Sequence, residues 1–475
     1  MHIRSSKWLI TASLILLFSS GCKKWEDHIN VSDPNITKTV FQQISENPDL
    51  SKFTQYVVST GYDKVLNSTK TYTVFAPSNT AMAAVGVDIT GDTAKLNKFI
   101  SNHIANQVYN TLNVSGTVRV KMLNGKYVNM FGKIMEDANI TKADILASNG
   151  VVQILDKALP YLPNIWEALL TNTSIPAKQK AYLLSLYTNV FDATNAIQTG
   201  VNPVTGVPIY QAGTDSVTTN QFWLNVHDVR NESNQYTLFV LSDAAWDAEI
   251  TKLKPYFATS TVDSTTKLCS WEVVKDLAVA GVYTPSGAAA DSIFSKFNTK
   301  TPIEKASIAQ TIKTSNGTIY IMNKVDNLAK YKIKPFYVEA ENYRYTSIDR
   351  RGNTYFRDRF NPITNKDFTD VLVTGHGVSG YNMNYRINNV SSVKYRAYWV
   401  ALNDFQTTTF SQKLGIGSAA STILPLTVVS PNIYTEVLLG EFTFTNYQSF
   451  LDLFLVANGT TQISCDYFRL EPVVP

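Results

Sequence analysis

Two stretches of eleven residues, YTVFAPSNTAM at 72–82 and YTLFVLSDAAW at 236–246, decide the fold of this chain. Each begins with residues that alternate between apolar and polar, which is typical of a half-buried strand. Pro77 ends the first strand because proline cannot donate to a sheet ladder, and Leu241 stands in its place in the second stretch. Each stretch continues with residues that can cap a helix: Ser78 or Asn79 in the first, Ser242 and Asp243 in the second.

A second pair of similar fragments lies downstream of the first pair. ILASNGVVQILDK surrounds Asn149, and TIKTSNGTIYIMNK surrounds Asn316. The offset is 164 residues between Tyr72 and Tyr236 and 167 residues between the two asparagines. Two pairs at nearly one offset indicate a duplicated unit, and a period this long is typical of tandem domains. In the first copy we expect Gly150 to occupy a turn that requires positive φ, followed by a closing strand.

The first copy resembles a fasciclin domain over its whole length, which we place at residues 36–161. The resemblance rests on ENPDLSKFTQYVVSTGYDKVL, YTVFAPSNTAM, HIANQVY, LNGKYV and ASNGVVQILDKAL. The second copy, placed at 162–328, keeps YTLFVLSDAAW, VVKDLAVAGVY and SNGTIYI and resembles a divergent fasciclin domain. The resemblance implies strands packed against helices, and a role in adhesion or extracellular binding without catalysis.

The second copy carries an insertion at 192–234 that is rich in Thr, Asn and Gly. A long insertion in a compact domain is either functional or disordered, and the segment QFWLNV within it favours a binding loop. Before the second motif, one helix face is predicted from Leu183, Leu186, Tyr187, Val190 and Phe191. In the first copy, His103 lies where fasciclin domains have a histidine linked to receptor binding. A structural histidine at the edge of the core is the favoured interpretation.

Residues 1–21 have the features of an export signal: a basic start, the apolar run WLITASLILLF and small residues before the expected cut. The cysteine that follows, Cys22, resembles that of the bacterial lipobox, which implies a lipid anchor on Cys22. An ordinary secretory signal with a coincidental cysteine is the alternative. We expect 22–35 to be a polar tether, and Glu26 and Asp27 resemble a surface-export signal. The expected location is therefore the outer membrane, facing the cell exterior.

The composition excludes several classes of function. The net charge is +4 and charged residues make up 17% of the chain, which is too few and too balanced for a nucleic-acid partner or for electrostatic docking to a membrane. We therefore expect membrane contact only through the lipid anchor. Apart from Cys22, Cys269 and Cys465 are interpreted as buried hydrophobic residues. The five histidines have no metal-ligand spacing, and we expect no enzymatic activity.

Beyond residue 334 the helical pattern disappears. Short alternating runs with Gly/Asn-rich breaks predict an all-β sandwich at 334–475. The opening VEAEN and the closing CDYFRLEPV resemble carbohydrate-binding modules with a galactose-binding-like jelly roll. The expected fold class is thus α+β, with two tandem fasciclin-like domains followed by an all-β jelly-roll sandwich.

Three carboxylates of the sandwich are candidate metal ligands. In a strand, Glu339 and Glu341 point to the same face, and Asp466 begins the strand expected to run beside it. Converging carboxylates attract a hard cation, and oxygen ligands favour calcium. The resemblance implies a structural calcium on these same residues. The alternative is that they are ordinary residues at a strand edge.

Sugar recognition needs exposed aromatic faces with hydrogen-bonding side chains around them. Tyr381, beside a glycine in an expected loop, is the first choice. Tyr355 and Phe356 in DRRGNTYFRDRF are further aromatic candidates. The predicted ligand-binding residues are Tyr381, Asn382, Tyr385, Trp399 and Asn458.

Two functional hypotheses follow. In the first, a surface-anchored lipoprotein binds a polysaccharide or glycoconjugate through its sandwich. The fasciclin pair then serves as a stalk or as a docking platform for an outer-membrane transport or adhesion protein. In the alternative, a lipoprotein for protein–protein adhesion or matrix scaffolding acts through its fasciclin domains. An exposed coplanar aromatic pair on the sandwich would favour the first hypothesis, and a large apolar patch on a fasciclin face would favour the second.

Overall fold

The computed structural model describes residues 34–474 apart from 113–115, 288–290 and 327. The predicted export signal, Cys22 and nearly all of the tether lie outside the described residues. None of the helices formed by the described residues is long and apolar enough to cross a membrane. The chain divides into two compact units. The first contains the described residues up to Trp166 with the short segments 230–234 and 314–316, and the second contains the remainder.

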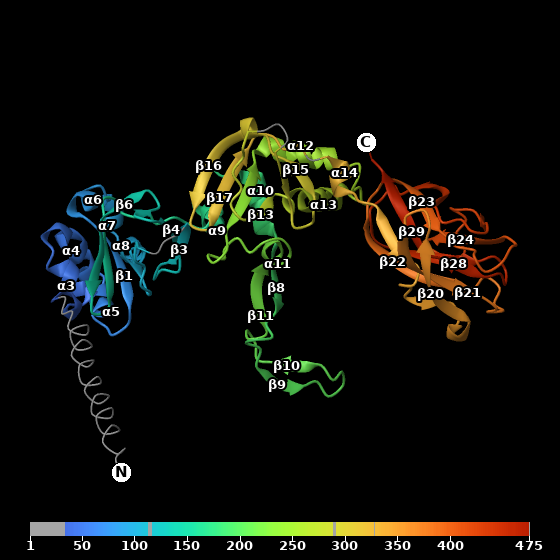
Figure 1. The fold of residues 1–475 in the computed structure, drawn as a ribbon, viewed down its shortest axis with the longest axis horizontal. Coiled ribbons are helices and arrows are strands. Elements are labelled where there is room, and N and C mark those ends of the chain that lie inside the picture. Colours follow the sequence, from blue (N-terminus) through green and yellow to red (C-terminus); the bar gives the residue numbers. More distant parts are fainter. Residues whose placement is uncertain (1–33, 113–115, 288–290, 327, 475) are drawn as a thin grey trace, which may run out of the picture. The chain divides into compact units, whose positions relative to one another are not determined.

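The first unit is a mixed α+β domain (Figure 1). Its helical segments are η1 (Pro34–Thr37), α3 (Val40–Ser45), η2 (Pro48–Leu50), α4 (Ser51–Ser59), α5 (Tyr62–Leu66), α6 (Asn79–Ala83), α7 (Val87–Thr90) and α8 (Thr93–Ser101). Its strands are β1 (Tyr72–Pro77), β2 (Ile104–Ala105), β3 (Thr117–Lys121), β4 (Tyr127–Phe131), β5 (Ile134–Met135), β6 (Ala138–Ala147) and β7 (Gly150–Leu155). They form one sheet in the order β2-β1-β7-β6-β5-β4-β3.

Strand β1 lies in the interior of this domain. Val74 and Ala76 belong to a hydrophobic cluster shared with α3, α4 and α8, whereas Phe75 belongs to a second cluster shared with β3 to β6. All six residues of β1 are therefore buried, and the expectation of a half-buried strand was wrong. The physical reason is that both faces of this strand are covered, so polar Thr73 is buried as well.

The parallel pair β1–β7 runs in register from Tyr72 opposite Gly150 to Pro77 opposite Leu155. Gly150 has φ +148°, and a Cβ at this position would lie 1.8 Å from the carbonyl oxygen of Tyr72. The predicted need for glycine is thereby confirmed. Ser78, which follows β1, accepts the backbone N–H of Ala81 and is the N-cap of α6.

His103 is fully buried in the first domain. Its Nδ1 lies 2.8 Å from the carbonyl oxygen of Phe99, and the backbone N–H of Leu159 donates to its Nε2 at 2.9 Å. Burial lowers its pKa to about 4, so the ring is neutral at neutral pH. These contacts support the structural interpretation of this histidine.

The second unit begins with a related α+β arrangement. Its helical segments are α9 (Ile165–Thr171), α10 (Ala177–Ser185), α11 (Gln221–Asn225), α12 (Asp243–Leu253), α13 (Val262–Val274), η3 (Lys305–Ser307) and α14 (Ala329–Lys332). Strands β12 (Tyr236–Leu241), β13 (Ala278–Ala280), β16 (Ile308–Thr314) and β17 (Gly317–Met322) form a sheet in the order β13-β12-β17-β16, and β14 (Ser292–Phe294) pairs with β15 (Lys300–Pro302). Tyr236 lies opposite Gly317 in the parallel pair β12–β17, the same register as Tyr72 and Gly150.

The inserted segment, together with the strand before it, forms two successive pairs of antiparallel strands. Strand β8 (Tyr187–Phe191) pairs with β11 (Ser216–Asn220), and β9 (Gln198–Val201) pairs with β10 (Pro208–Tyr210). The ribbon leads away from α10 and α11, with β9 and β10 at its far end (Figure 1). The predicted helix face over 183–191 was wrong beyond Ser185, because Tyr187–Phe191 forms strand β8 and pairs with β11. QFWLNV forms α11, in which Phe222 and Trp223 are buried and anchor the segment.

The second unit ends in an all-β sandwich. Its strands are β18 (Phe336–Glu339), β19 (Tyr345–Thr346), β20 (Thr354–Asn361), β21 (Lys366–Val373), β22 (Asn382–Val390), β23 (Lys394–Val400), β24 (Phe410–Ile416), β25 (Thr427–Val429), β26 (Val437–Thr443), β27 (Gln448–Ala457), β28 (Ile463–Cys465) and β29 (Tyr467–Val473), with the turn η4 (Arg351–Asn353). They form sheets in the orders β18-β29-β23-β26, β19-β22-β27-β24-β25 and β20-β21-β28. Cys269 and Cys465 are buried and unbridged, as predicted.

Candidate functional site

The three predicted metal ligands line one groove of the sandwich, with a volume of about 960 Å³. Glu339 ends β18, opposite Tyr467 of β29. Glu341 follows in the turn after β18, and Asp466 lies between β28 and β29. The backbone N–H of Ala340 donates to the carbonyl of Asp466 at 2.7 Å, which holds the two chain segments together.

The electrostatics of this groove indicate that its carboxylates interact. Burial and the nearby charges of Glu339, Asp370 and Glu341 raise the pKa of Asp466 to about 7. Burial and Glu341 also raise the pKa of Glu339. Oε2 of Glu341 is buried and has no hydrogen-bond partner. The groove therefore concentrates negative charge that a cation would neutralise.

Within the described part of the chain, no three or more His, Cys, Asp or Glu side chains are grouped so that they could hold one metal ion. Glu339, Glu341 and Asp466 thus share a groove without forming a closed ligand set, and the calcium site stays a prediction. Sequence reasoning missed Asp370, which is buried and lies within electrostatic reach of Asp466. The Asp370 carboxylate binds Arg357 at 2.5 Å. Asp370 and Asp466 are far apart in the sequence, so no local pattern could have predicted that Asp370 lies near this groove.

The aromatic residues chosen as sugar-stacking candidates lie in the core. Tyr381, Tyr385 and Trp399 are at most 1% exposed. The Tyr385 hydroxyl donates to the carbonyl of Ala340, and its ring packs edge-on against Phe468. The expectation that these three rings bind a sugar was wrong, because a buried ring offers no free face to a ligand.

The two predicted asparagines lie close to two loops that meet: Asn382 is the first residue of β22, and Asn458 directly follows β27. The backbone N–H of Gly380, two residues before Asn382, donates to the carbonyl of Gly459, which follows Asn458, at 2.8 Å. Asn458 is exposed and Asn382 is half-buried. Asn382 also exchanges hydrogen bonds with Ser347, in the segment that follows β19. These loops therefore form one end of the sandwich, and both amides remain candidates for binding.

An aromatic pair is present at this end of the sandwich. The rings of Tyr343 and Phe356 are nearly parallel, with an interplanar angle of 8° and centroids 6.4 Å apart. Phe356 is 56% exposed, whereas Tyr343 is half-buried. The sequence signalled Phe356 as a candidate but not Tyr343, because their proximity depends on the packing of β20 against the turn before β19.

A charged group lies near this aromatic pair, because Arg351 is within electrostatic reach of Tyr343. Asp349 binds Arg351 at 2.7 Å, and both side chains are mostly exposed. Hydrogen bonds from Arg351 lower the pKa of Asp349 to about 2, so this carboxylate is ionised at neutral pH. Arg350 donates to the carbonyl of His376, which connects the η4 turn to the loop before β22. The site thus combines exposed ring surface with fixed donors and acceptors.

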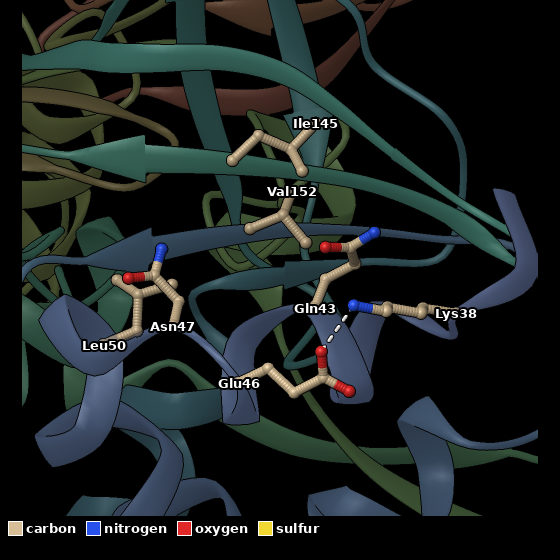
Figure 2. Close-up of a pocket in the computed structure, with 7 residues that line it drawn as sticks. All are labelled: Lys38, Gln43, Glu46, Asn47, Leu50, Ile145 and Val152. Atoms are coloured by element: carbon tan, nitrogen blue, oxygen red, sulfur yellow. Dashed lines mark hydrogen bonds and ion pairs between the residues drawn. The ribbon is translucent and has the colours of Figure 1, made fainter. Parts of the chain in front are cut away.

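Two depressions lie in the first domain. One, of about 210 Å³, is lined by Lys38, Gln43, Glu46, Asn47, Leu50, Ile145 and Val152. Figure 2 shows Lys38 directed towards Glu46, which it binds at 2.5 Å. Gln43 donates to the carbonyl of Leu146, so these polar groups are already paired within the protein. The other depression, of about 360 Å³, is mainly apolar and includes Ala84, Phe99 and Leu159.

The fold and these sites define a mixed α+β protein that ends in an all-β sandwich. Residues 48–162 match the family model of the Fasciclin domain. The transforming growth factor-beta-induced protein ig-h3 of Sus scrofa is 26% identical over 129 residues, which make up 26% of this chain and 19% of that protein. The chain thus spans less than a fifth of this curated relative.

Solved structures are similar to both parts of the chain. A FAS1 domain pair from the insect cell adhesion molecule Fasciclin I is 17% identical with a TM-score of 0.23, covering 59% of this chain and 97% of that one. The module CsCBM6-3 from Clostridium stercorarium, in complex with cellobiose, is 16% identical with a TM-score of 0.20 and covers 29% of this chain and 94% of that one. A family 35 carbohydrate binding module from Clostridium thermocellum is 13% identical with a TM-score of 0.20, covering 29% of this chain and 98% of that one.

Proposed function

We propose that this protein is a surface-anchored, non-catalytic lipoprotein that binds an extracellular polysaccharide or glycoconjugate through its C-terminal sandwich. The observation that carries the proposal is the near-parallel pair Tyr343–Phe356 at one end of the sandwich. A sugar ring has an apolar face and a polar rim, so it binds where aromatic surface lies beside hydrogen-bonding groups.

In this proposal each residue of the site has a separate role. The sugar lies against the exposed face of Phe356, and Tyr343 extends the apolar surface. Asp349 accepts from sugar hydroxyls and Arg351 donates to them, because both charged groups are exposed and already held in place by each other. Asn382, at the start of β22, and Asn458, in the loop after β27, supply neutral amides to a second sugar of the same polymer.

Calcium is the cation that we propose for Glu339, Glu341 and Asp466. The chemistry fits, because these are hard oxygen donors in a negatively charged groove, and Glu341 has a buried oxygen without a partner. Calcium would supply positive charge between segments that flank β29 and would stiffen the sandwich. Its role in this proposal is structural, and the sugar site is separate from it.

The remaining parts of the chain serve attachment in this proposal. A lipid on Cys22 anchors the protein to the outer membrane, facing the cell exterior, and residues 22–35 form the tether. The fasciclin pair is a stalk or a docking platform for an outer-membrane transport or adhesion protein.

Binding of the full chain to an array of polysaccharides, followed by titration calorimetry, tests the sugar site. We expect Phe356→Ala and Tyr343→Ala each to weaken binding at least tenfold. Tyr355→Ala is the matched control, because Tyr355 is a neighbouring exposed aromatic on β20 whose side chain points to the opposite face. Equal losses for Tyr355 and Phe356, or no binding by a folded chain across a broad array, would refute the proposed site.

Calcium titration of the full chain tests the cation site. We expect calcium to raise the unfolding temperature of the sandwich, and Asp466→Asn to abolish this effect. Because the pKa of Asp466 is about 7 without the cation, calcium affinity should rise as the pH increases from 6 to 8. Glu436→Gln is the control, since Glu436 lines the same groove but is bound to Arg469.

Adhesion through the fasciclin domains is the second candidate function, and the apolar depression of the first domain favours it. If a protein partner binds there, Ala84→Glu should reduce adhesion of cells that display the protein while glycan binding persists. Val87→Glu is the control, because Val87 is 85% exposed on the neighbouring helix α7 and does not line the depression.

A further inference from the structure

Residues 187–220, here named the arm, present an unusual surface. The arm comprises β8 to β11, two pairs of strands with little apolar interior of their own. Many of its large apolar side chains are exposed, and Val204 at the distal turn is 91% exposed. The others that matter here are Phe191, Ile197, Val201, Val207 and Ile209. Isolated two-stranded hairpins are marginally stable in water, so such a ribbon gains from a partner that covers it.

The charge pattern of the arm departs from that of the rest of the chain. The chain has 42 Lys and Arg residues, but none lies between residues 187 and 220. The only charged residues of the arm are Asp192, directly after β8, and Asp215, directly before β11. Exposed strand edges are normally protected by lysine or other charges that prevent pairing with another chain. The distal hairpin lacks this protection.

The arm is held in one conformation by its own contacts. The backbone N–H of Asp192 donates to the carbonyl of Asp215 at 2.9 Å, which closes the proximal hairpin. Asn202 accepts the backbone N–H groups of Val204 and Thr205, which fixes the distal turn. A pre-ordered surface loses less conformational entropy when it binds, so this ribbon is prepared for association.

We propose that the arm is a dimerisation element, in which β9 of one chain pairs antiparallel with β9 of a second copy. Among the described residues β9 pairs with β10 alone, so its other edge is open. Pro208, at the start of β10, has no N–H to donate, which makes the β10 edge the poorer one. The assembly is a four-stranded sheet in the order β10-β9-β9-β10.

Charge favours a second copy as the occupant of this edge. A two-fold axis brings the β9 strands of two identical chains side by side, so a charge on β9 would lie near the same charge of the other copy. β9 consists of Gln198, Thr199, Gly200 and Val201 and carries no charge. This proposal is independent of the sugar site.

Sedimentation velocity of the full chain, in one detergent for all variants, tests the proposal. We expect a dimer at about 50 µM chain, a concentration that populates complexes of micromolar Kd. Replacing Val201, Val204 and Val207 by lysine should weaken dimerisation at least tenfold, because the added positive charges protect the hairpin edge and make the two arms repel each other. The matched control places three lysines outside the arm, at Val87, Val262 and Val282, which are also exposed, and it should remain dimeric.

Cross-linking provides a positive measurement of the same contact. Thr199→Cys should form disulfide-linked dimers on mild oxidation, because residue 199 lies near the two-fold axis. Ser260→Cys, an exposed position outside the arm, should not. Cys269 and Cys465 are buried and do not compete. A monomeric wild-type chain, a dimer that survives the arm substitutions, or equal cross-linking of the two cysteine variants would overturn the proposal.

Discussion

The two fasciclin-like copies hold their central strand pair with the same side chains. Thr73 donates to a backbone carbonyl and accepts a backbone N–H, and Thr237 makes the same two contacts in the second copy. Asn149 and Asn316 each accept an N–H from the segment that begins their copy. These polar side chains are conserved between copies because they satisfy buried backbone groups whose positions the fold determines.

The positions next to these shared contacts, here called the shared frame, carry different side chains in the two copies. The N–H of Phe75 in β1 donates to the carbonyl of His103, and the N–H of Phe239 in β12 donates to the carbonyl of Leu277. The preceding residues are Asn102, which donates to the carbonyl of Pro160, and Asp276, which is paired with a buried lysine. The comparison teaches that the side-chain contacts that hold the central strand pair persist after duplication, whereas the side chains of the neighbouring segment are free to change.

The largest expected effect is loss of the shared frame. Gly150→Ala and Gly317→Ala place a Cβ 1.8 Å from a carbonyl oxygen of the neighbouring strand, so the parallel pair must separate. We expect each substitution to destabilise its own domain by about 4 kcal/mol or more. Hydrogen exchange of the β1 and β12 amides measures the two domains separately.

Gly125→Ala is the control for backbone strain alone. Gly125 has φ +83°, but an added Cβ there meets nothing within 4 Å. We expect a cost of about 1 kcal/mol from the unfavourable φ. If Gly150→Ala costs no more than Gly125→Ala, the close approach of β7 to β1 is not essential to the fold.

The next effect concerns the buried ion pair of the second copy. Lys332 and Asp276 are 2.5 Å apart and both side chains are fully buried. Lys332→Met leaves the Asp276 charge without its partner, which should cost about 3–5 kcal/mol. Adding Asp276→Asn, which copies the neutral Asn102 of the first domain, should restore most of this loss. Hydrogen exchange of α13 measures both variants, and a double variant no more stable than the single one would contradict the comparison.

The stability of the two copies should depend differently on pH. The pKa of His103 is lowered to about 4 by burial, whereas an unfolded chain binds this proton near pH 6.5. Unfolding therefore takes up a proton between these values, and the first domain should lose about 2 kcal/mol as the pH falls from 6.5 to 4.5. Hydrogen exchange of β1 and β2, corrected for intrinsic rates, measures this loss.

His103→Gln should remove most of this pH dependence, because an amide can replace both hydrogen bonds without titrating. The second copy has Leu277 in the equivalent place. The stability of the second copy should therefore depend less on pH, although burial and Lys296 lower the pKa of its half-buried His227. An equal pH dependence in wild type and His103→Gln would show that other groups cause it.

Local patterns in the sequence predicted the parts of this fold that local chemistry determines. The duplicated motifs located β1, β7, β12 and β17, and the glycine requirement at Gly150 followed from the turn before a strand. The failures share one cause, which is contact between distant segments. Alternation in β22 and β23 could not show that Tyr385 and Trp399 face the core. Nor could it show that Tyr343 lies beside Phe356.

The smallest effect tests the helix caps that both motifs predicted. Ser78 accepts the N–H of Ala81 at 3.2 Å, and Ser242 accepts that of Ala245 at 3.3 Å. We expect Ser78→Ala and Ser242→Ala to cost about 1 kcal/mol each. Denaturant unfolding followed by hydrogen exchange of α6 and α12 measures the losses. Losses that differ by more than about 1 kcal/mol would show that the two caps contribute unequally to stability although their geometry is the same.

The residue after each cap sharpens this prediction, because it acts on a different helix. Asn79 accepts the N–H of Lys52 in α4, and Asp243 accepts the N–H of Lys178 in α10. Both contacts satisfy an otherwise unpaired N–H in the first turn of a helix. Asp243 also brings a negative charge to that turn, which adds about 0.5 kcal/mol through the helix dipole. Asn79 in turn donates to the carbonyl of Pro48 and to the hydroxyl of Ser51. Asn79→Ala should therefore cost more than Asp243→Ala, and Asp243→Asn should cost only about 0.5 kcal/mol.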